Sequence, residues 1–111
     1  MPESLSAKRG KVGMKRGHPN RGELVVCRIT KLYPNSAEAE LLEYQKGGMI
    51  HVSEVASRWV RDIREFLKEH QYVVCRVIFV DQRGISLSMK RVRPEEGARR
   101  LNEFKRERKA E

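Results

Sequence analysis

Residues 47–63, with the sequence GGMIHVSEVASRWVRDI, constrain the fold of this chain more than any other segment. The paired glycines predict a turn, because glycine adopts positive φ angles without steric cost. Residues 49–52 form an apolar run that suits a strand and is too short for a helix. Residues 58–69 then place apolar side chains at helical spacing, which predicts a helix over about that range. Its apolar face is expected to hold Trp59, Ile63 and Phe66, with Val60 and Leu67 beside them. The centre of the chain is therefore predicted to be a short strand followed by a helix.

Apolar segments on either side of this unit predict four more strands. They cover about residues 23–33, 36–44, 72–80 and 85–90. The second of these would also suit a helix, because it is rich in alanine, leucine and glutamate. Asp81–Gly84 is predicted to be a tight hairpin turn, and Pro94 to open a C-terminal helix. Three strands, a helix and two strands is the order of the oligonucleotide-binding (OB) fold, an all-β barrel of five strands.

The two cysteines lie in similar apolar runs, VVCRI and VVCRV. In the OB topology the first and fourth strands are neighbours, so Cys27 and Cys75 are expected on adjacent strands. We expect buried free thiols, with a disulfide as the alternative. The sequence has no CxxC motif and no Cys/His cluster, so neither a metal nor a cofactor is expected. Trp59 is assigned to the floor of the barrel rather than to base stacking.

The formal net charge of +9 is concentrated at the two ends of the chain. Residues 1–22 carry a net +5 and residues 89–111 a net +4, whereas residues 23–88 carry nine basic and nine acidic side chains. A neutral body with cationic extensions suits contact with a polyanion. A pI near 10 favours nucleic acid over a purely solubilising role for these extensions. Residues 1–21 hold few apolar side chains, so we expect a disordered basic extension there.

Several classes of function find no support in the sequence. No apolar run approaches the ~20 residues of a membrane span, and the N-terminus has no apolar core of a signal peptide. We therefore expect a cytoplasmic protein without a membrane partner. No nucleophile–base spacing, acidic metal cluster or phosphate-binding glycine loop occurs, so no enzyme and no catalytic residue is expected.

Five segments of the chain together resemble one known family. They read GELVVCRITKLY, LLEY, GMIHVSEVASRWVRDIREFLKE, VVCRVIFVD and GISLSMKRVRPEE. Over about residues 22–97 they resemble the N-terminal S1-type RNA-binding domain of the alpha subunit of archaeal and eukaryotic translation initiation factor 2. The resemblance implies a five-stranded S1-type OB barrel at residues 22–93, after a basic extension at residues 1–21. It also implies that residues 94–111 are a basic helix, the stub of a following helical domain.

The same resemblance implies a function and partners. The family acts in the complex that delivers initiator tRNA to the small ribosomal subunit. The implied partners are RNA, either initiator tRNA or small-subunit ribosomal RNA, and other subunits of the factor, with no DNA. Two alternatives stay open: a stand-alone structural protein of the ribosome, and a module that presents residues 53–68 to another translation factor.

The chain departs from this family at several points. The family's third domain, which binds the gamma subunit, has no counterpart in these 111 residues. The family's aromatic second-strand segment appears here as residues 35–39, NSAEA, without an aromatic side chain. Base stacking on an aromatic contributes ~1–3 kcal/mol, so weaker binding on the barrel face is expected. The serine phosphorylated in eukaryotic members aligns with Ala56, so that modification is not expected. The turn at residues 81–84 is shorter than the family's, and the N-terminal extension is longer.

The predicted RNA-binding residues form three groups: basic residues of the extension, ring-bearing residues of the barrel surface, and basic residues of the helix and the barrel exit. They are Lys8, Arg9, Lys11, Lys15 and Arg16 in the first group, Tyr33 and His51 in the second, and Arg58, Arg61, Arg64, Lys68, Arg91 and Arg93 in the third. The alternative for each arginine is an ordinary solvated helix face. For Tyr33 it is a partly buried strand-end aromatic, and for His51 a solvent-facing strand residue.

Overall fold

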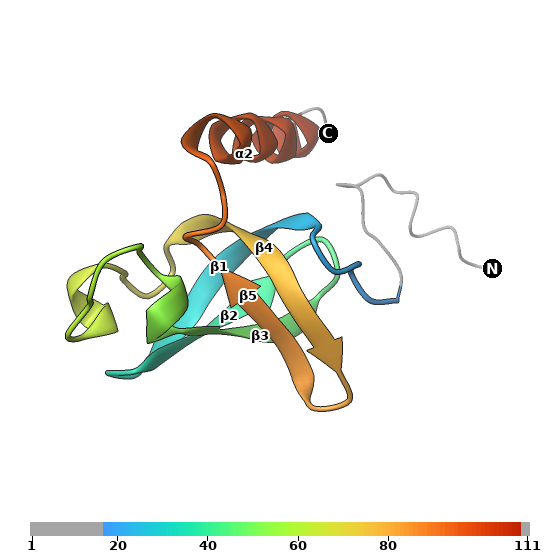
Figure 1. Cartoon of the computed structure of the whole chain (residues 1–111). Coiled ribbons are helices and arrows are strands. Elements are labelled where there is room, and N and C mark those ends of the chain that lie inside the picture. Colours follow the sequence, from blue (N-terminus) through green and yellow to red (C-terminus); the bar gives the residue numbers. More distant parts are fainter. Residues whose placement is uncertain (1–16, 110–111) are drawn as a thin grey trace.

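The computed structural model describes residues 17–109, which fold into a closed five-stranded barrel and one α-helix (Figure 1). The strands are β1 (Leu24–Leu32), β2 (Ser36–Leu41), β3 (Lys46–His51), β4 (Tyr72–Asp81) and β5 (Gly84–Ser88), and the helix is α2 (Pro94–Lys109). The strand order around the barrel is β1-β2-β3-β5-β4, antiparallel except for the parallel pair β3 and β5. The predicted OB-type barrel with a C-terminal helix is confirmed. Residues 1–16 of the predicted extension lie outside the described residues.

The barrel interior is filled by alternate residues of each strand. The side chains with the least exposure include Ile29, Leu41, Ile50 and Leu87, as the predicted period-2 pattern requires. Val25 on β1 pairs with Cys75 on β4, and Cys27 pairs with Val73, so the two cysteines lie on adjacent strands as predicted. Both are buried free thiols. A hydrogen bond with Cys75 and burial raise the pKa of the Cys27 thiol well above its ordinary value.

The paired glycines belong to a strand, so their assignment to a turn was wrong. Gly47 and Gly48 lie in β3, opposite Glu40 and Ala39 of β2. The turn precedes them and contains Gln45, which takes a positive φ of 57°. Gly48 is buried because β5 and β2 approach its backbone closely. A Cβ atom at this position would lie 2.8 Å from Leu87 Cδ1.

The α-helix predicted over residues 58–69 is absent. The segment between β3 and β4 contains two short 3-10 turns instead, Val52–Glu54 and Ile63–Glu65. Its backbone keeps only short turns of its own, such as the bonds from the Phe66 and Leu67 N–H groups to the Ile63 carbonyl. Other bonds run to the barrel: the Ile63 N–H donates to the Pro34 carbonyl and the His70 N–H to the Ile29 carbonyl. The bond from Ile63 removes a donor that a continuous helix over residues 58–69 would use.

The apolar residues of this segment still pack on the barrel, with one exception. Of the predicted apolar residues, Val60, Ile63 and Leu67 are buried and Phe66 is partly buried. Trp59, which was assigned to the barrel floor, is 81% exposed, and that assignment was wrong. Since the segment is not helical, Trp59 does not share a face with Ile63.

Two β-bulges shift the phase of the barrel strands. On β1 the pairing with β2 shifts between Ile29 and Lys31. On β4 the pairing with β5 shifts between Val77 and Phe79. A bulge adds one residue to a strand and so reverses the side to which the following side chains point. After the second bulge Val80 packs against the core, whereas Phe79 is 48% exposed.

Helix α2 packs against β1 and β4 (Figure 1). Phe104 is the buried anchor of its apolar stripe. The Arg76 guanidinium of β4 donates to Glu96 of α2 and to the carbonyls of Gly22 and Arg91. Glu43, 3% exposed, pairs with Arg100 on the same helix. Neither α2 nor any other described helix has the length and apolar character to cross a membrane.

Candidate nucleic-acid interface

The outer face of β2, β3 and β5 carries the candidate surface. Ser36 of β2 lies opposite His51 of β3, and Glu38 lies opposite Met49. Met49 in turn lies beside Ser86 of β5. Side chains at these positions point away from the core, because their neighbours along each strand are buried.

Tyr33 and His51 come together at one end of this face. The Tyr33 N–H donates to the carbonyl of Ser36, the residue opposite His51. The Tyr33 ring is 39% exposed, and its hydroxyl donates to Glu38 Oε2 over 3.2 Å. The Ser53 N–H donates to His51 Nδ1 over 3.1 Å, so the neutral ring carries its proton on Nε2. The pair thus offers one aromatic face and one N–H donor at the surface.

The basic residues of the 52–71 segment are mostly paired. Arg61 forms an ion pair with Glu65, and Arg64 with Asp62 over 2.8 Å. Hydrogen bonds from the Arg64 side chain and backbone lower the pKa of Asp62 to about 2. Arg58 stacks on Phe66, with its guanidinium carbon 5.0 Å from the ring centroid. Lys68 has no ion pair within residues 17–109.

The two exit arginines differ from each other in their contacts. Arg91 Nε donates to Glu54 Oε1 over 3.1 Å. Burial raises the pKa of Glu54, but hydrogen bonds from Ser88 and Arg91 outweigh it, and the net shift is downward. The Arg93 side chain is exposed, with no ion pair in the described part of the chain. Of the predicted basic residues of the body, Arg58, Lys68 and Arg93 therefore keep a charge that no described carboxylate balances, and Arg58 is held over the Phe66 ring. Lys8, Arg9, Lys11, Lys15 and Arg16 lie outside the described residues.

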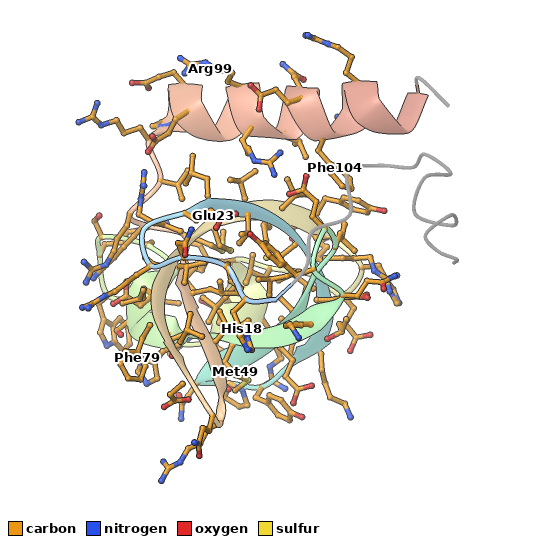
Figure 2. All side chains as sticks on the ribbon, turned by 90° about the vertical axis from the view of Figure 1, so that its right-hand side faces the viewer. His18, Glu23, Met49, Phe79, Arg99 and Phe104 are labelled. Atoms are coloured by element: carbon orange, nitrogen blue, oxygen red, sulfur yellow. The ribbon has the colours of Figure 1, made fainter. Side chains whose placement is uncertain are left out.

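The structure adds surface residues that the sequence reasoning missed. Phe79 was missed because alternation from Val77 places it inward, and only the bulge turns it outward. Arg21 Nε donates to the Ile78 carbonyl over 3.0 Å, which fixes this cation beside the bulge. Figure 2 shows Phe79 and Met49 on the side of the barrel away from α2. Asp81 has a structural role, because its Oδ1 accepts hydrogen bonds from the N–H groups of Arg83 and Gly84 and so closes the hairpin turn.

A shallow hollow borders Met49 on the same face. Its lining includes Glu38 and Glu40 of β2, the two glycines of β3, and Arg83 of the β4–β5 turn. A second hollow on the other side of Met49 is lined by His51, Ser53 and Ser86, among others. Within residues 17–109 no group of three or more His, Cys, Asp or Glu side chains is placed to hold a metal ion. The face therefore offers aromatic, hydroxyl and imidazole groups for recognition of a ligand.

Comparison with known proteins gives consistent matches. No protein-family model matches the chain. The chain is 48% identical to the translation initiation factor 2 subunit alpha of Pyrococcus horikoshii. The alignment extends over 99 residues and covers 86% of this chain. The same subunit of Methanocaldococcus jannaschii is 44% identical over 96 residues. The chain spans only about 36% of the length of these curated relatives.

The solved structures that this chain resembles include the same subunit. The intact alpha subunit of aIF2 from Pyrococcus abyssi matches with a TM-score of 0.77 and 47% identity, over 83% of this chain and 36% of that one. The alpha subunit in a complex with aDim2p and rRNA from Pyrococcus horikoshii matches with a TM-score of 0.76 and 46% identity, over 81% of this chain and 55% of that chain. The similarity thus extends through most of the barrel described above and is one of sequence and fold together.

Proposed function

Because the chain resembles the N-terminal S1-type OB-fold domain of the alpha subunit of translation initiation factor 2, we propose that it acts in translation initiation as an RNA-binding, alpha-subunit-like protein. The observation that carries this proposal is 48% identity over 86% of the chain, on a closed barrel of the same fold. One similar alpha subunit was crystallised in a complex that contains rRNA. The proposed ligands are initiator tRNA and the RNA of the small ribosomal subunit, in the cytoplasm.

The charge distribution supports RNA as the ligand. The chain carries a net +9, and the body between residues 23 and 88 has equal numbers of basic and acidic side chains. We infer that residues 1–21, 22–93 and 94–111 make different contributions to RNA binding. The two ends supply sequence-independent attraction to phosphates, and the barrel at residues 22–93 supplies discrimination.

Individual residues take distinct roles in this proposal. Lys68 and Arg93 contact phosphates directly, because no described carboxylate neutralises them. Arg61, Arg64 and Arg91 first have to exchange a carboxylate partner, which lowers their net contribution. Arg58 has no carboxylate partner among the described residues and contacts phosphate from its position over the Phe66 ring. Tyr33 and His51 contact bases at the end of β2 and β3. Lys8, Arg9, Lys11, Lys15 and Arg16 add the non-specific affinity.

A second candidate function is supported by the segment between β3 and β4. Trp59 is 81% exposed there, and two of the neighbouring arginines are already paired with carboxylates. An exposed tryptophan beside arginines is typical of the energetic centre of a protein–protein interface. Binding of a translation-factor subunit to this segment, insensitive to salt and independent of RNA, would favour this candidate.

The test is fluorescence anisotropy of the full chain with initiator tRNA, an unstructured RNA and small ribosomal subunits, at two salt concentrations. The matched variant replaces the five basic residues of positions 8–16 by glutamine. We expect the variant to bind more weakly to every RNA, with a salt slope reduced by roughly 0.7–0.9 for each phosphate that it no longer neutralises. It should keep its preference for initiator tRNA or the subunit over unstructured RNA. Disappearance of that preference would contradict a discriminating role for the barrel.

A further inference from the structure

The exposed ring of Phe79 has no partner among the described residues. We propose that Phe79, Met49 and Arg21 form a binding site for unpaired RNA bases across β4, β5 and β3. This inference rests on the proposed RNA-binding function and adds which face and which kind of RNA the barrel takes. The ligand class is single-stranded RNA, held by stacking on Phe79.

The strand register places two exposed apolar side chains on either side of Ser86, and the space between them is here called the slot. Phe79 lies opposite Ser86, and Ser86 lies beside Met49 on its other side. Neighbouring strands are about 4.8 Å apart, so Phe79 and Met49 stand about 10 Å apart across the small serine. A flat base can enter this space with its face on the Phe79 ring and its edge near the Ser86 hydroxyl. Figure 2 labels both apolar side chains on this part of the barrel.

Phe79 and Met49 are the two most exposed large apolar residues of the barrel strands, followed by Tyr72 at 40%. Phe79 is 48% exposed and Met49 is 43% exposed, although the barrel buries most of its other large apolar residues. The bulge between Val77 and Phe79 is what turns the ring outward. Bulges often re-aim a side chain beside a functional site. An aromatic held outward by a rigid strand is suited to stacking, since each base presents a π-face.

The charges around the slot indicate on which side of Phe79 the phosphates of the bound strand lie. Arg21 is fixed beside Ile78, the residue before Phe79, by its Nε bond to the backbone carbonyl. Its other guanidinium nitrogens form no ion pair within residues 17–109, so they can bind a phosphate. Glu38, opposite Met49, places a carboxylate on the β2 side and repels phosphates there. Phosphates are therefore expected on the Arg21 side, next to the point where the basic extension joins the barrel.

The same geometry discriminates against duplex RNA. Stacking on Phe79 needs a base whose face is free, and in a duplex both faces are covered by neighbouring bases. The cationic ends can attract a duplex equally well, because phosphate contacts carry no such requirement. A preference for single strands is thus the property by which Phe79 can be told apart from the tails.

The first experiment measures anisotropy of labelled oligouridine and of a duplex of equal length with the full chain, near physiological salt. Phe79→Ala is expected to weaken binding of the single strand by about 5- to 150-fold and to leave duplex binding unchanged. The matched control is Tyr72→Ala, which removes an aromatic of similar exposure (40%) from the other end of β4. Its affinity should stay within about twofold of wild type, and thermal unfolding checks that both variants are folded.

Arg21 is tested by its salt dependence. Arg21→Ala should lower the salt slope for oligouridine by about 0.7, the amount expected for one phosphate contact. Arg99→Ala, which removes an exposed arginine from the outer side of α2 (Figure 2), should leave the slope unchanged. Equal effects of the two variants would overturn the role of Arg21.

A second measurement observes stacking directly and does not depend on a weaker affinity. Trp59→Phe removes the only tryptophan, and Phe79→Trp then places a single fluorophore in the slot. Oligouridine is expected to quench its emission at saturation, and the affinity should stay close to wild type. Binding by the wild-type chain without an effect of Phe79→Ala and without quenching would overturn this inference and leave the proposed function standing. No binding of any RNA by the wild-type chain would overturn both.

Discussion

At the scale of single residues, Gly48 decides how closely the barrel closes. β3 pairs with β2 on one side and with β5 on the other, and Gly48 is buried between them. A Cβ atom there would lie 2.8 Å from Leu87 Cδ1 and 3.1 Å from the Ile85 carbonyl oxygen. The side chain can move, but the carbonyl belongs to a barrel strand and has little freedom. Glycine is therefore required at this position by close approach and not by a turn.

We predict that Gly48→Ala lowers the free energy of unfolding by about 1–3 kcal/mol, the usual cost of overpacking a core. Gly47→Ala is the matched control, because nothing lies within 4 Å of a Cβ atom at that neighbouring position. It should change stability by less than about 0.5 kcal/mol. Urea unfolding of both variants measures the difference. Equal stability of the two variants would show that β3 and β5 are further apart than the structure places them.

At the scale of elements, Arg76 joins three parts of the chain. Its guanidinium donates to the carbonyl of Gly22 over 2.8 Å, to the carbonyl of Arg91 over 3.0 Å, and to the carboxylate of Glu96. These partners lie before β1, after β5 and in the first turn of α2. The Arg93 N–H and the Arg76 side chain, both bonded to Glu96, lower the pKa of that carboxyl. A single side chain of β4 thus fixes where the extension enters the barrel and where the helix leaves it.

Arg76→Ala is expected to release α2 from the barrel. The removal of hydrogen bonds that involve charged groups should lower the free energy of unfolding by about 2–3 kcal/mol. Amide hydrogen exchange should become faster in residues 94–106, whereas the amides of the barrel strands follow only the global change. Arg28→Ala is the control, since its ion pair with Glu40 is long, at 3.6 Å, and partly exposed to solvent. Unchanged exchange in α2 after Arg76→Ala would contradict this role.

The segment between β3 and β4 marks the limit of pattern reading at this scale. The spacing predicted an apolar face of Trp59, Ile63 and Phe66, with Val60 and Leu67 beside it. It was right for Val60, Ile63 and Leu67, which are buried, and for Phe66, which is partly buried, but wrong for Trp59. It did not identify the backbone, because a helix and a pair of 3-10 turns can present the same three residues to a core. The bonds that decide between them run to the carbonyls of Pro34 and Ile29, which are distant in sequence. Trp59 is exposed for this reason, and no local signal distinguishes its environment.

At the scale of the whole molecule, most of the architecture could be predicted. Five strands, their order and the neighbouring strands of the two cysteines follow from alternation and from the order of the elements. The surface residues were harder to predict. A bulge reverses the side of the strand to which every later side chain points, and no clear sequence signal marks it. Phe79 is the main example, since alternation from Val73 to Val77 predicts that it points inward. The ion pairs of Arg61 and Arg64 likewise depend on local geometry that composition does not reveal.

The barrel face is expected to recognise RNA, and the basic ends to add affinity without discrimination. The most direct test of this division is a titration of the ¹⁵N-labelled full chain with oligouridine, followed by the backbone amide signals in NMR spectra. We predict the largest shifts on the outer face of β3, β5 and β4, at Met49, Ser86 and Phe79, with smaller shifts at His51. Shifts confined to residues 1–21 and to the Trp59 segment, with no change on those three strands, would contradict it.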